Sequence, residues 1–473
     1  MESFDLIVIG SGPAGEKGAA RAAYFDKKVA LVEKLPVLGG AAANTGTLPS
    51  KTLRETALFL SGFKQRQLFG LDFRGLKDKV LISDFLAHER TVKDTERARI
   101  VENLRKHHIT IYSGTASFID PQTIAVRPER CPETLLRAEK TLIATGSYPF
   151  RPKELPFYDP RICDSDTILM LHEIPDKMLV VGGGVIGCEY ACMFAALGVR
   201  VILVEKRAGI LNFMDPDIVA TLQNRMEMMG IQFYFNDGVA AIDCGEIMKV
   251  RLQTGGVLEI DNVLISSGRC GNIAGLDLDK VGVVSSDRGI IKINEHYQTS
   301  QPNIYAAGDV VGSPALASTS MEQGRAAVVH ACQLQNLATT ESIMPTGIYT
   351  IPECSMAGES EESLKQKKVP YVVGKSLYEK NARGQIVGDH FGFLKLLFHA
   401  EDLRLLGVHV VGEQAAEIIH IGLTALMLKA NAHLFLDTCY NYPTLSEMYK
   451  YAAYEALGRK SRGQIEGAVA TQA

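Results

Sequence analysis

Two glycine-rich turns, about 170 residues apart, are the segments of this sequence best suited to bind nucleotides. Their glycines are Gly10, Gly12 and Gly15 in the first turn and Gly182, Gly184 and Gly187 in the second. Three glycines at this spacing permit a tight turn, close approach of a pyrophosphate to the backbone, and packing of a helix on a strand. The free N–H groups at the start of that helix then face the phosphates. Each turn therefore predicts a phosphate-binding site.

An acidic residue follows each turn at the same distance. Glu33 and Glu205 each lie 18 residues after the last glycine of their turn, where a carboxylate accepts a hydrogen bond from a ribose 2′-hydroxyl. Glu205 favours NAD, because a carboxylate repels the 2′-phosphate of NADP. Lys206 and Arg207 come next, and they either reach such a phosphate or end a solvated loop. The choice between NAD and NADP stays open at this point.

Both turns lie between a strand and a helix, and this context makes the glycine spacing informative. Short apolar runs before each turn are typical of buried parallel strands. Two ordinary βαβ units without a nucleotide are the alternative, but they do not explain why the acid recurs in both. The expected strands are 6–10, 29–33, 178–181 and 199–205, with helices through 18–23 and 189–197.

The remainder of the chain changes character near residues 344–345. Before that point we expect a charged helix and further strands, and after it the alternation of apolar and polar residues indicates an antiparallel sheet. The last dozen residues are small and polar, which predicts a loose tail. The expected segments are a helix over 92–108, strands at 109–112, 141–144, 303–309, 392–398 and 405–411, and helices over 414–430 and 444–457.

Composition excludes several classes of protein. The 473 residues are 46% hydrophobic and 22% charged, with a net charge of -4, which is typical of a globular protein and not of a disordered or fibrous one. A charge so near zero gives no electrostatic footprint for nucleic acid or an anionic membrane. The N-terminal residues do not resemble a signal peptide, and no apolar run is long enough to span a bilayer.

The nine cysteines include no CxxC pair. A disulfide framework or zinc site is therefore not expected, and a reducing, cytoplasmic location is. Cys188 and Cys192, four residues apart in an expected helix, are interpreted as small buried hydrophobes. His420, in an apolar C-terminal segment, is interpreted as a packing residue.

At this point the chain resembles a known family, the flavoprotein disulfide reductases such as lipoamide dehydrogenase. The match rests on the segment 39–51, which runs from Gly39 and Gly40 to Pro49-Ser50-Lys51, and on further segments in family order. These are 144–149, Gly268-Arg269, Ala307-Gly308-Asp309 and 441–447.

The resemblance implies an α/β fold with two Rossmann-like dinucleotide-binding domains and a C-terminal α+β dimerisation domain. It assigns residues 1–149 and 271–343 to a split FAD-binding domain and 150–270 to an NAD(P)-binding domain. Residues 344–460 form the dimerisation domain and 461–473 the tail. A homodimer or larger assembly is implied, because in this family the C-terminal domain reaches into the partner's active site.

The resemblance also implies roles for individual residues. Lys51 corresponds to the lysine beside flavin N5, and Glu189 to the acid that pairs with it. Asp309 corresponds to the aspartate that holds the flavin ribityl chain, although an acid there also suits the start of a helix. The other cofactor-binding positions that it implies are Gly39, Gly40, Ser147 and Gly268. The glycines of the two turns, their acids and Arg207 are candidates on the arguments from the residues given above.

Four positions decide which reaction is expected. The two redox cysteines of the family are replaced by Ala42 and Thr47, and the catalytic histidine near the C-terminus is replaced by Tyr442, while Glu447 remains. The chain lacks both the nucleophile and the base of thiol chemistry. Tyr442 and Glu447 either line the nicotinamide pocket or are relics, and the sequence leaves both possibilities open.

Thr47 and Tyr442 resemble the corresponding residues of the transhydrogenases of the family, and segments 345–353 and 416–422 do so too. Ala42 departs from the transhydrogenases as well, because they often keep the first cysteine, which hydride transfer does not need. The implied reaction is hydride exchange between NADPH and NAD+ by a ping-pong scheme through flavin N5, with FAD, NAD and NADP as cofactors and substrates. Two alternatives remain: an FAD-dependent NAD(P)H oxidase or diaphorase, and a flavoprotein that acts only as a binding scaffold.

Overall fold

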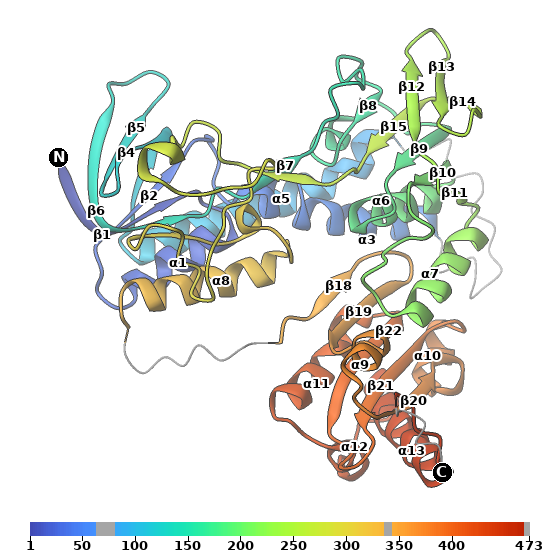
Figure 1. Cartoon of the computed structure of the whole chain (residues 1–473). Coiled ribbons are helices and arrows are strands. Elements are labelled where there is room, and N and C mark those ends of the chain that lie inside the picture. Colours follow the sequence, from blue (N-terminus) through green and yellow to red (C-terminus); the bar gives the residue numbers. More distant parts are fainter. Residues whose placement is uncertain (63–80, 335–342, 468–473) are drawn as a thin grey trace.

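The computed structural model describes residues 1–62, 81–334 and 343–467. Within these residues the chain forms two units built on parallel strands and a third built on an antiparallel sheet, as Figure 1 shows. The predicted fold class, α/β with two Rossmann-like units and a C-terminal α+β unit, is confirmed.

The first unit is a seven-stranded sheet with the strand order β3-β2-β1-β6-β5-β4, in which β17 also pairs with β6. Strand β1 lies between two parallel neighbours, and Leu6, Ile7 and Val8 are fully buried. The strands are β1 (Glu2–Ile9), β2 (Val29–Glu33), β3 (Thr110–Ser113), β4 (Thr115–Asp120), β5 (Thr123–Arg127), β6 (Thr134–Ile143) and β17 (Ile304–Ala306).

Helices α1 and α8 of this unit pack together beside the sheet (Figure 1). Strand β17 and helix α8 belong to this unit although they follow the second unit along the chain. Helix α5 begins ten residues before the predicted position 92. The helices are α1 (Pro13–Ala23), α2 (Gly40–Asn44), α3 (Thr47–Ser61), α5 (Ile82–Lys106), η3 (Leu278–Val281), η4 (Asp309–Val311) and α8 (Ala317–Ala331).

The second unit is a five-stranded parallel sheet with the order β11-β10-β9-β15-β8, flanked by an antiparallel meander. The pair β7 (Ser147–Pro149) and β16 (Arg269–Gly271) lies where the chain passes between the two units. The elements are β8 (Ile162–Cys163), η2 (Ile168–Met170), β9 (Lys177–Val181), α6 (Val185–Ala196), β10 (Arg200–Glu205), α7 (Pro216–Met228), β11 (Gln232–Phe235), β12 (Val239–Asp243), β13 (Met248–Leu252), β14 (Val257–Ile260) and β15 (Asn262–Ile265).

The third unit is the predicted antiparallel sheet, with the order β18-β19-β22-β21-β20, and helices α11 and α13 pack against its strands. Its strands are β18 (Thr346–Ile348), β19 (Glu353–Gly358), β20 (Tyr371–Leu377), β21 (Phe393–His399) and β22 (Leu405–Gly412). Its helices are α9 (Glu361–Lys367), η5 (Tyr378–Lys380), α10 (Ala382–Val387), α11 (Ala415–Met427), α12 (Ala432–Asp437), η6 (Leu445–Glu447) and α13 (Met448–Ser461).

One part of the expected tail is not loose. Glu466 exchanges two backbone hydrogen bonds with Tyr371 at the start of β20, so the chain beyond α13 returns to the sheet. Residues 468–473 of the expected tail lie outside the described residues.

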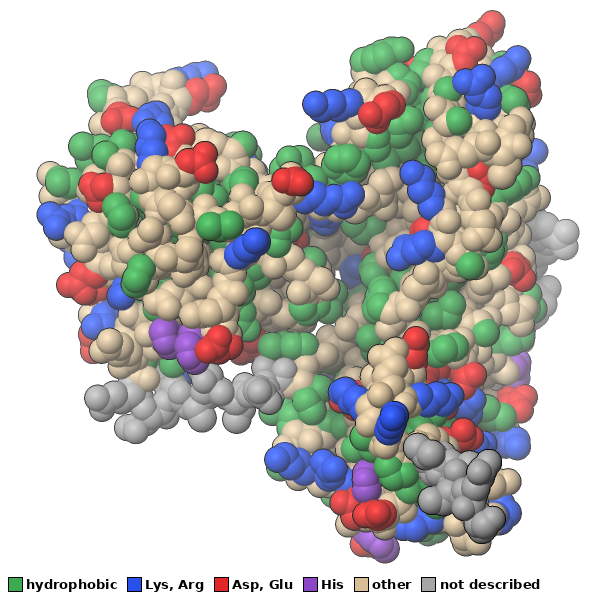
Figure 2. All heavy atoms as spheres, in the orientation of Figure 1, with side chains coloured by type: hydrophobic (Ala, Val, Ile, Leu, Met, Phe, Trp, Pro, Cys, Tyr) green, Lys and Arg blue, Asp and Glu red, His purple; other side chains and the backbone are tan. Residues whose placement is uncertain are grey.

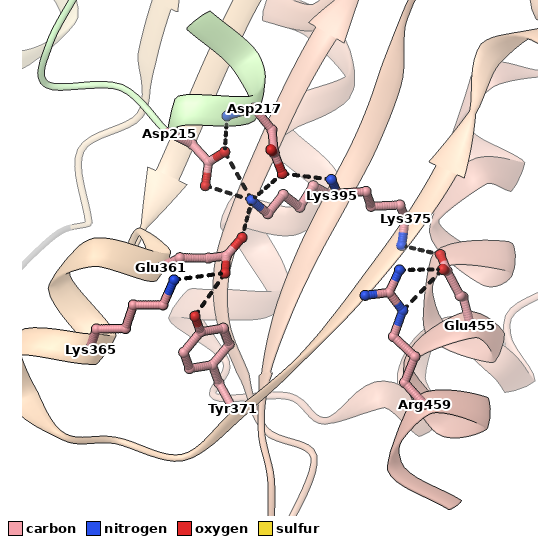
Figure 3. A network of polar contacts seen from close by, with 9 residues as sticks. All are labelled: Asp215, Asp217, Glu361, Lys365, Tyr371, Lys375, Lys395, Glu455 and Arg459. Atoms are coloured by element: carbon pink, nitrogen blue, oxygen red, sulfur yellow. Dashed lines mark hydrogen bonds and ion pairs between the residues drawn. The ribbon is translucent and has the colours of Figure 1, made fainter. Parts of the chain in front are cut away.

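The second and third units are joined by a buried ion network, drawn in Figure 3. The ammonium of Lys395 in β21 lies 2.9 and 2.8 Å from the two carboxylate oxygens of Asp215 and 2.8 Å from Asp217. It also contacts Glu361 of α9. Asp215 caps the start of α7 by accepting a hydrogen bond from the Asp217 N–H. Burial alone lowers the pKa of Lys395, but its hydrogen bonds to the three carboxylates raise it above the usual value.

Candidate active site

A cavity of about 1050 Å³ runs between the three units, and residues of each unit line it. Figure 2 shows the surface hollowed between the first unit, at left, and the rest of the chain. This volume is at the upper end of the range for small-molecule pockets. Both glycine turns reach the cavity, through Gly10 and Gly12 in the first and Gly184 in the second.

In the first turn the three glycines have three different environments. A Cβ on Gly10, whose φ is +105°, would lie 2.4 Å from the carbonyl oxygen of Ala144, and a Cβ on Gly15 would lie 1.9 Å from that of Gly10. Beside Gly12, in contrast, the nearest atom to such a Cβ is 3.8 Å away. The outer glycines are therefore needed for packing, whereas the middle one leaves room for a phosphate.

The second turn repeats this arrangement. A Cβ on Gly182, at φ +109°, would meet the carbonyl oxygen of Ser266 at 2.6 Å, and one on Gly187 would meet that of Gly182 at 1.9 Å. No atom lies within 4 Å of a Cβ built on Gly184. Helices α1 and α6 begin directly after Gly12 and Gly184, so their free N–H groups face the open space. The local geometry thus fits two dinucleotides.

Glu33 ends β2 at the edge of the cavity and is nearly buried. Its carboxylate accepts hydrogen bonds from the N–H and hydroxyl of Ser11 at 2.9 and 2.7 Å and from the N–H of Leu35 at 2.9 Å. The Ser11 hydroxyl also accepts a hydrogen bond from the N–H of Gly39. The backbones of Gly40 and Gly12 are in close contact, because a Cβ built on Gly40 would lie 2.8 Å from the Cα of Gly12. These contacts fix the acid, the glycine turn and the start of α2 as one wall.

Glu205 ends β10 in the second unit and forms an ion pair with Arg207. The carboxylate accepts hydrogen bonds from the N–H of Gly183 at 2.6 Å, the N–H of Arg207 at 2.9 Å and Arg207 Nε at 3.0 Å. Burial alone raises the pKa of Glu205, but these hydrogen bonds bring it below the usual value, so it is ionised at neutral pH. Arg207 is 56% exposed, whereas Glu205 is nearly buried.

Lys51 of α3 and Glu189 of α6 meet in the cavity wall, although 138 residues separate them. The ammonium of Lys51 lies 2.9 and 2.8 Å from the two carboxylate oxygens of Glu189. The side chain of Glu189 is 5% exposed and that of Lys51 is 25% exposed. The structure therefore brings together the two residues that the family resemblance pairs, at the junction of the two nucleotide-binding units.

The segment around Asp309 forms another part of the wall. Asp309 begins the short helix η4, and its carboxylate accepts a hydrogen bond from Ser147 Oγ at 2.8 Å. Arg269 donates to Ser147 Oγ at 2.7 Å and to the Ser147 carbonyl at 2.9 Å. Gly268, at φ +105°, lines the same cavity. The four predicted residues Ser147, Gly268, Asp309 and Lys51 thus share one cavity.

Ala42 and Thr47 line the cavity as well. Ala42 lies in α2 and Thr47 begins α3, four residues before Lys51. The described residues that line the cavity include no cysteine. A methyl group and a hydroxyl therefore stand where thiol chemistry would need two thiolates.

Tyr442 and Glu447 do not reach the cavity within one chain. Tyr442 is 73% exposed, and Glu447, at the end of η6, accepts a hydrogen bond from Tyr451 at 3.4 Å. Neither lines the cavity. Their predicted place in the site thus depends on a second copy of the chain.

Tyr349, Tyr190 and Asp166 are among the cavity residues that were not predicted from the sequence. Tyr349 follows β18, Tyr190 lies in α6, and Asp166 lies just before η2. Tyr190 carries a buried hydroxyl without a hydrogen-bond partner, and burial raises the pKa of Asp166. Tyr190 directly follows Glu189, and Tyr349 lies in segment 345–353 of the transhydrogenase resemblance, whereas no pattern pointed to Asp166.

Other predictions have mixed outcomes. Cys188 and Cys192 are fully buried and free, which confirms their interpretation as small hydrophobes. His420 is exposed on α11, so its interpretation as a packing residue is wrong.

In the part of the chain that the structure describes, no group of three metal-ligating side chains is present, and no helix has the length and apolar character needed to cross a bilayer.

Comparison with known proteins gives consistent matches. The family model for pyridine nucleotide-disulphide oxidoreductases matches residues 4–324, and the model for their dimerisation domain matches 344–453. A soluble pyridine nucleotide transhydrogenase of Mycobacterium tuberculosis is 43% identical over 97% of this chain and 98% of its own length. One of Pseudomonas putida is 40% identical over 97% and 99%.

Solved structures show the same fold. LpdA of Mycobacterium tuberculosis has a TM-score of 0.88 against this chain, with 24% identity over 96% of this chain and 99% of its own. The HOCl-induced flavoprotein disulfide reductase RclA of Escherichia coli has a TM-score of 0.82 and 25% identity, over 94% and 98%.

Proposed function

The chain belongs to the pyridine nucleotide-disulphide oxidoreductase family, and on that premise we propose that it is an FAD-dependent transhydrogenase that exchanges hydride between NADPH and NAD+. One observation carries the proposal. The cavity contains both nucleotide turns and the Lys51–Glu189 pair, but Ala42 and Thr47 occupy the cysteine positions. The similarity to soluble pyridine nucleotide transhydrogenases supports the same conclusion.

The residues of the first unit fit FAD. The open space beside Gly12 takes the pyrophosphate, Glu33 takes the adenosine ribose, and Asp309 takes the ribityl hydroxyls. When bound, FAD supplies the two-electron acceptor and donor through which hydride passes between nicotinamide rings.

Lys51 and Glu189 act on the charge that hydride transfer creates. The ammonium of Lys51 stabilises added negative charge at the flavin position, and in a partly buried site this attraction is stronger than in water. Glu189 fixes the ammonium, because both of its carboxylate oxygens accept hydrogen bonds from it. Lys51 also donates a hydrogen bond to Ser50 Oγ at 3.3 Å, which helps to orient the ammonium.

The second unit takes both nicotinamide nucleotides in turn, as a ping-pong scheme requires. Glu205 accepts a hydrogen bond from the ribose of NAD+, and Arg207 supplies a cation for the 2′-phosphate of NADPH. The ion pair between them leaves Arg207 largely exposed, so its guanidinium is free to move toward a phosphate without crossing the protein core.

A homodimer completes this site. The match of residues 344–453 to a dimerisation domain supports such an assembly, and Tyr442 and Glu447 of that domain then face the nicotinamide pocket of the other copy. All nine cysteines are free, which supports a reducing location such as the cytoplasm.

An anaerobic experiment tests the function. The FAD-loaded protein receives one equivalent of NADPH while flavin absorbance is followed, and then thio-NAD+ is added. Bleaching and stoichiometric formation of reduced thio-NAD are expected. Bleaching without transfer would identify an oxidase or diaphorase, and no bleaching with NADPH or NADH would identify a scaffold.

A further inference from the structure

Tyr349 touches both members of the Lys51–Glu189 pair. The ammonium of Lys51 lies 4.9 Å from the centroid of the Tyr349 ring, a distance at which the ring face attracts a cation. The N–H of Tyr349 donates to Glu189 Oε1 at 2.9 Å. The three residues come from three units: Lys51 from α3, Glu189 from α6, and Tyr349 from the segment between β18 and β19.

The segment that carries Tyr349 is anchored to the same helix as Lys51. Arg54, three residues after Lys51 in α3, donates to the carbonyl of Thr350 at 3.0 Å and pairs with Glu353 at 3.2 Å. Glu353 in turn accepts a hydrogen bond from the N–H of Ala416 at the start of α11. The position of Tyr349 over Lys51 is therefore fixed on both sides of the contact.

We propose that Tyr349 is a positioning residue, whose ring face holds the Lys51 ammonium in place beside the flavin. Without the ring, the partly exposed lysine side chain loses its contact on that side and samples positions toward solvent. Burial raises the pKa of Tyr349, so the hydroxyl stays protonated at neutral pH and the ring stays neutral. The proposal needs the aromatic face and not the hydroxyl.

This inference deepens the proposed function, because it rests on Lys51 acting beside the flavin. The inference concerns only the reduction of the flavin by NADPH, so it holds whichever molecule later accepts the electrons. A positive charge near the flavin favours the added electrons and raises the midpoint potential. Moving the ammonium away therefore lowers the potential and slows flavin reduction by NADPH.

The test compares Tyr349→Phe, Tyr349→Leu and Tyr349→Met with wild type and with Lys51→Met. All three Tyr349 variants keep the N–H bond to Glu189, so they isolate the ring. The readouts are the flavin midpoint potential, the flavin absorption spectrum and the anaerobic rate of bleaching by NADPH. FAD content and the thermal unfolding temperature report on folding. Phe391→Leu removes a ring that lies 4.7 Å from Arg225, away from the cavity, and serves as the matched control.

We expect Tyr349→Phe and Phe391→Leu to match wild type. Tyr349→Leu and Tyr349→Met should lower the potential in the same direction as Lys51→Met and slow bleaching roughly two- to thirtyfold, the range for one cation–π contact. Wild-type potential and rate in either the Leu or the Met variant would overturn the proposal. Equal losses in the Phe and Leu variants would assign the effect to the hydroxyl and overturn it too. Failure of wild type to reduce thio-NAD+ would refute the proposed function and leave these comparisons valid.

Discussion

The carboxylate of Glu205 and the guanidinium of Arg207 form an ion pair at 3.0 Å beside the second glycine turn. The two residues prefer opposite nucleotides, since an acid suits a ribose hydroxyl and a cation suits a 2′-phosphate. Their pairing neutralises both charges when no phosphate is present. We therefore expect a site with this pair to accept NAD+ and NADPH in turn, as the proposed transhydrogenase reaction requires.

Replacing Arg207 should weaken the binding of NADP+ and leave the binding of NAD+ nearly unchanged. In Arg207→Leu we expect the dissociation constant for NADP+ to rise roughly ten- to a hundredfold, because a hydrogen bond to a charged group is lost. The constant for NAD+ should change little, since Glu205 keeps its bond from Gly183. Calorimetric titration of the FAD-loaded protein with each nucleotide measures both, and Lys249→Leu, at an exposed position of β13 outside the cavity, is the control. Equal weakening of both nucleotides would contradict the assignment of Arg207.

Replacing Lys51 should lower both the rate of flavin reduction and the stability of the fold, and a second substitution at Glu189 should restore only the stability. In Lys51→Met we expect FAD to remain bound but flavin reduction by NADPH to slow on the order of a hundredfold, the scale of one lost electrostatic contact in an active site. Glu189 is left buried without its cation, at a cost to folding of at most about 3 kcal/mol. The double variant Lys51→Met/Glu189→Gln should recover the stability and not the rate. Stopped-flow absorbance and urea unfolding provide the two measurements, and recovery of the rate in the double variant would exclude an electrostatic role for Lys51.

The sequence predicts the two nucleotide units well because their signals are local. A strand, a turn and a helix lie within about 30 residues, and Glu33 and Glu205 follow at a fixed spacing. Tyr349 and Lys395 have no such local signal, since Tyr349 contacts Lys51 and Glu189, and Lys395 contacts Asp215. These partners lie about 160 to 300 positions away, and only the packing of the units brings them near. Lys51 and Glu189 are also far apart along the chain, and only the family resemblance pairs them in advance of the structure.

Replacing Lys395 should destabilise the junction between the second and third units. Lys395 is 1% exposed and Asp215 is fully buried, so Lys395→Met leaves a buried carboxylate without its cation (Figure 3). We expect a loss of about 3–5 kcal/mol in chemical denaturation. Lys375→Met removes a half-buried lysine that pairs with the same acid cluster through Asp217, and it should cost less than about 1 kcal/mol. Similar losses in both variants would show that burial does not decide the strength of these pairs.

Acid should weaken the third unit through His409. Burial lowers the pKa of this imidazole, and Lys395 lowers it further, although Asp215, Glu361 and the carbonyl of Glu359 oppose the shift. In the unfolded chain a histidine takes up its proton near pH 6.5. Below that pH the unfolded state therefore binds more protons, and stability falls with decreasing pH by up to about 1.4 kcal/mol per unit. Above it this contribution is fully present.

His409→Gln isolates that contribution. The glutamine amide keeps a donor for the Glu359 carbonyl, which His409 Nε2 contacts at 2.9 Å, but it does not titrate. We expect the unfolding free energy of this variant to depend less steeply on pH between about 6.5 and 5 than that of wild type. Urea denaturation at several pH values measures both slopes. Parallel curves would show that another group controls the acid sensitivity.

Thiol chemistry should be absent from the wild type and difficult to restore. Ala42 and Thr47 supply no thiolate, so we expect no turnover of lipoamide or glutathione disulfide with NADH or NADPH. Turnover of either disulfide by the wild type would show that the loss of the two cysteines does not abolish thiol chemistry in this chain.

A stepwise restoration separates the nucleophile from the base. The double variant Ala42→Cys/Thr47→Cys supplies two thiols in the cavity wall but no base, because Tyr442 remains at the histidine position. Adding Tyr442→His should then raise disulfide turnover roughly a hundredfold or more, the scale of general acid–base catalysis. Since Tyr442 lies outside the cavity of its own chain, this gain should appear only in the dimer and fall on dilution to monomers. A gain that persists in the monomer would place the added histidine within reach of its own chain's cavity and contradict a site shared between two copies.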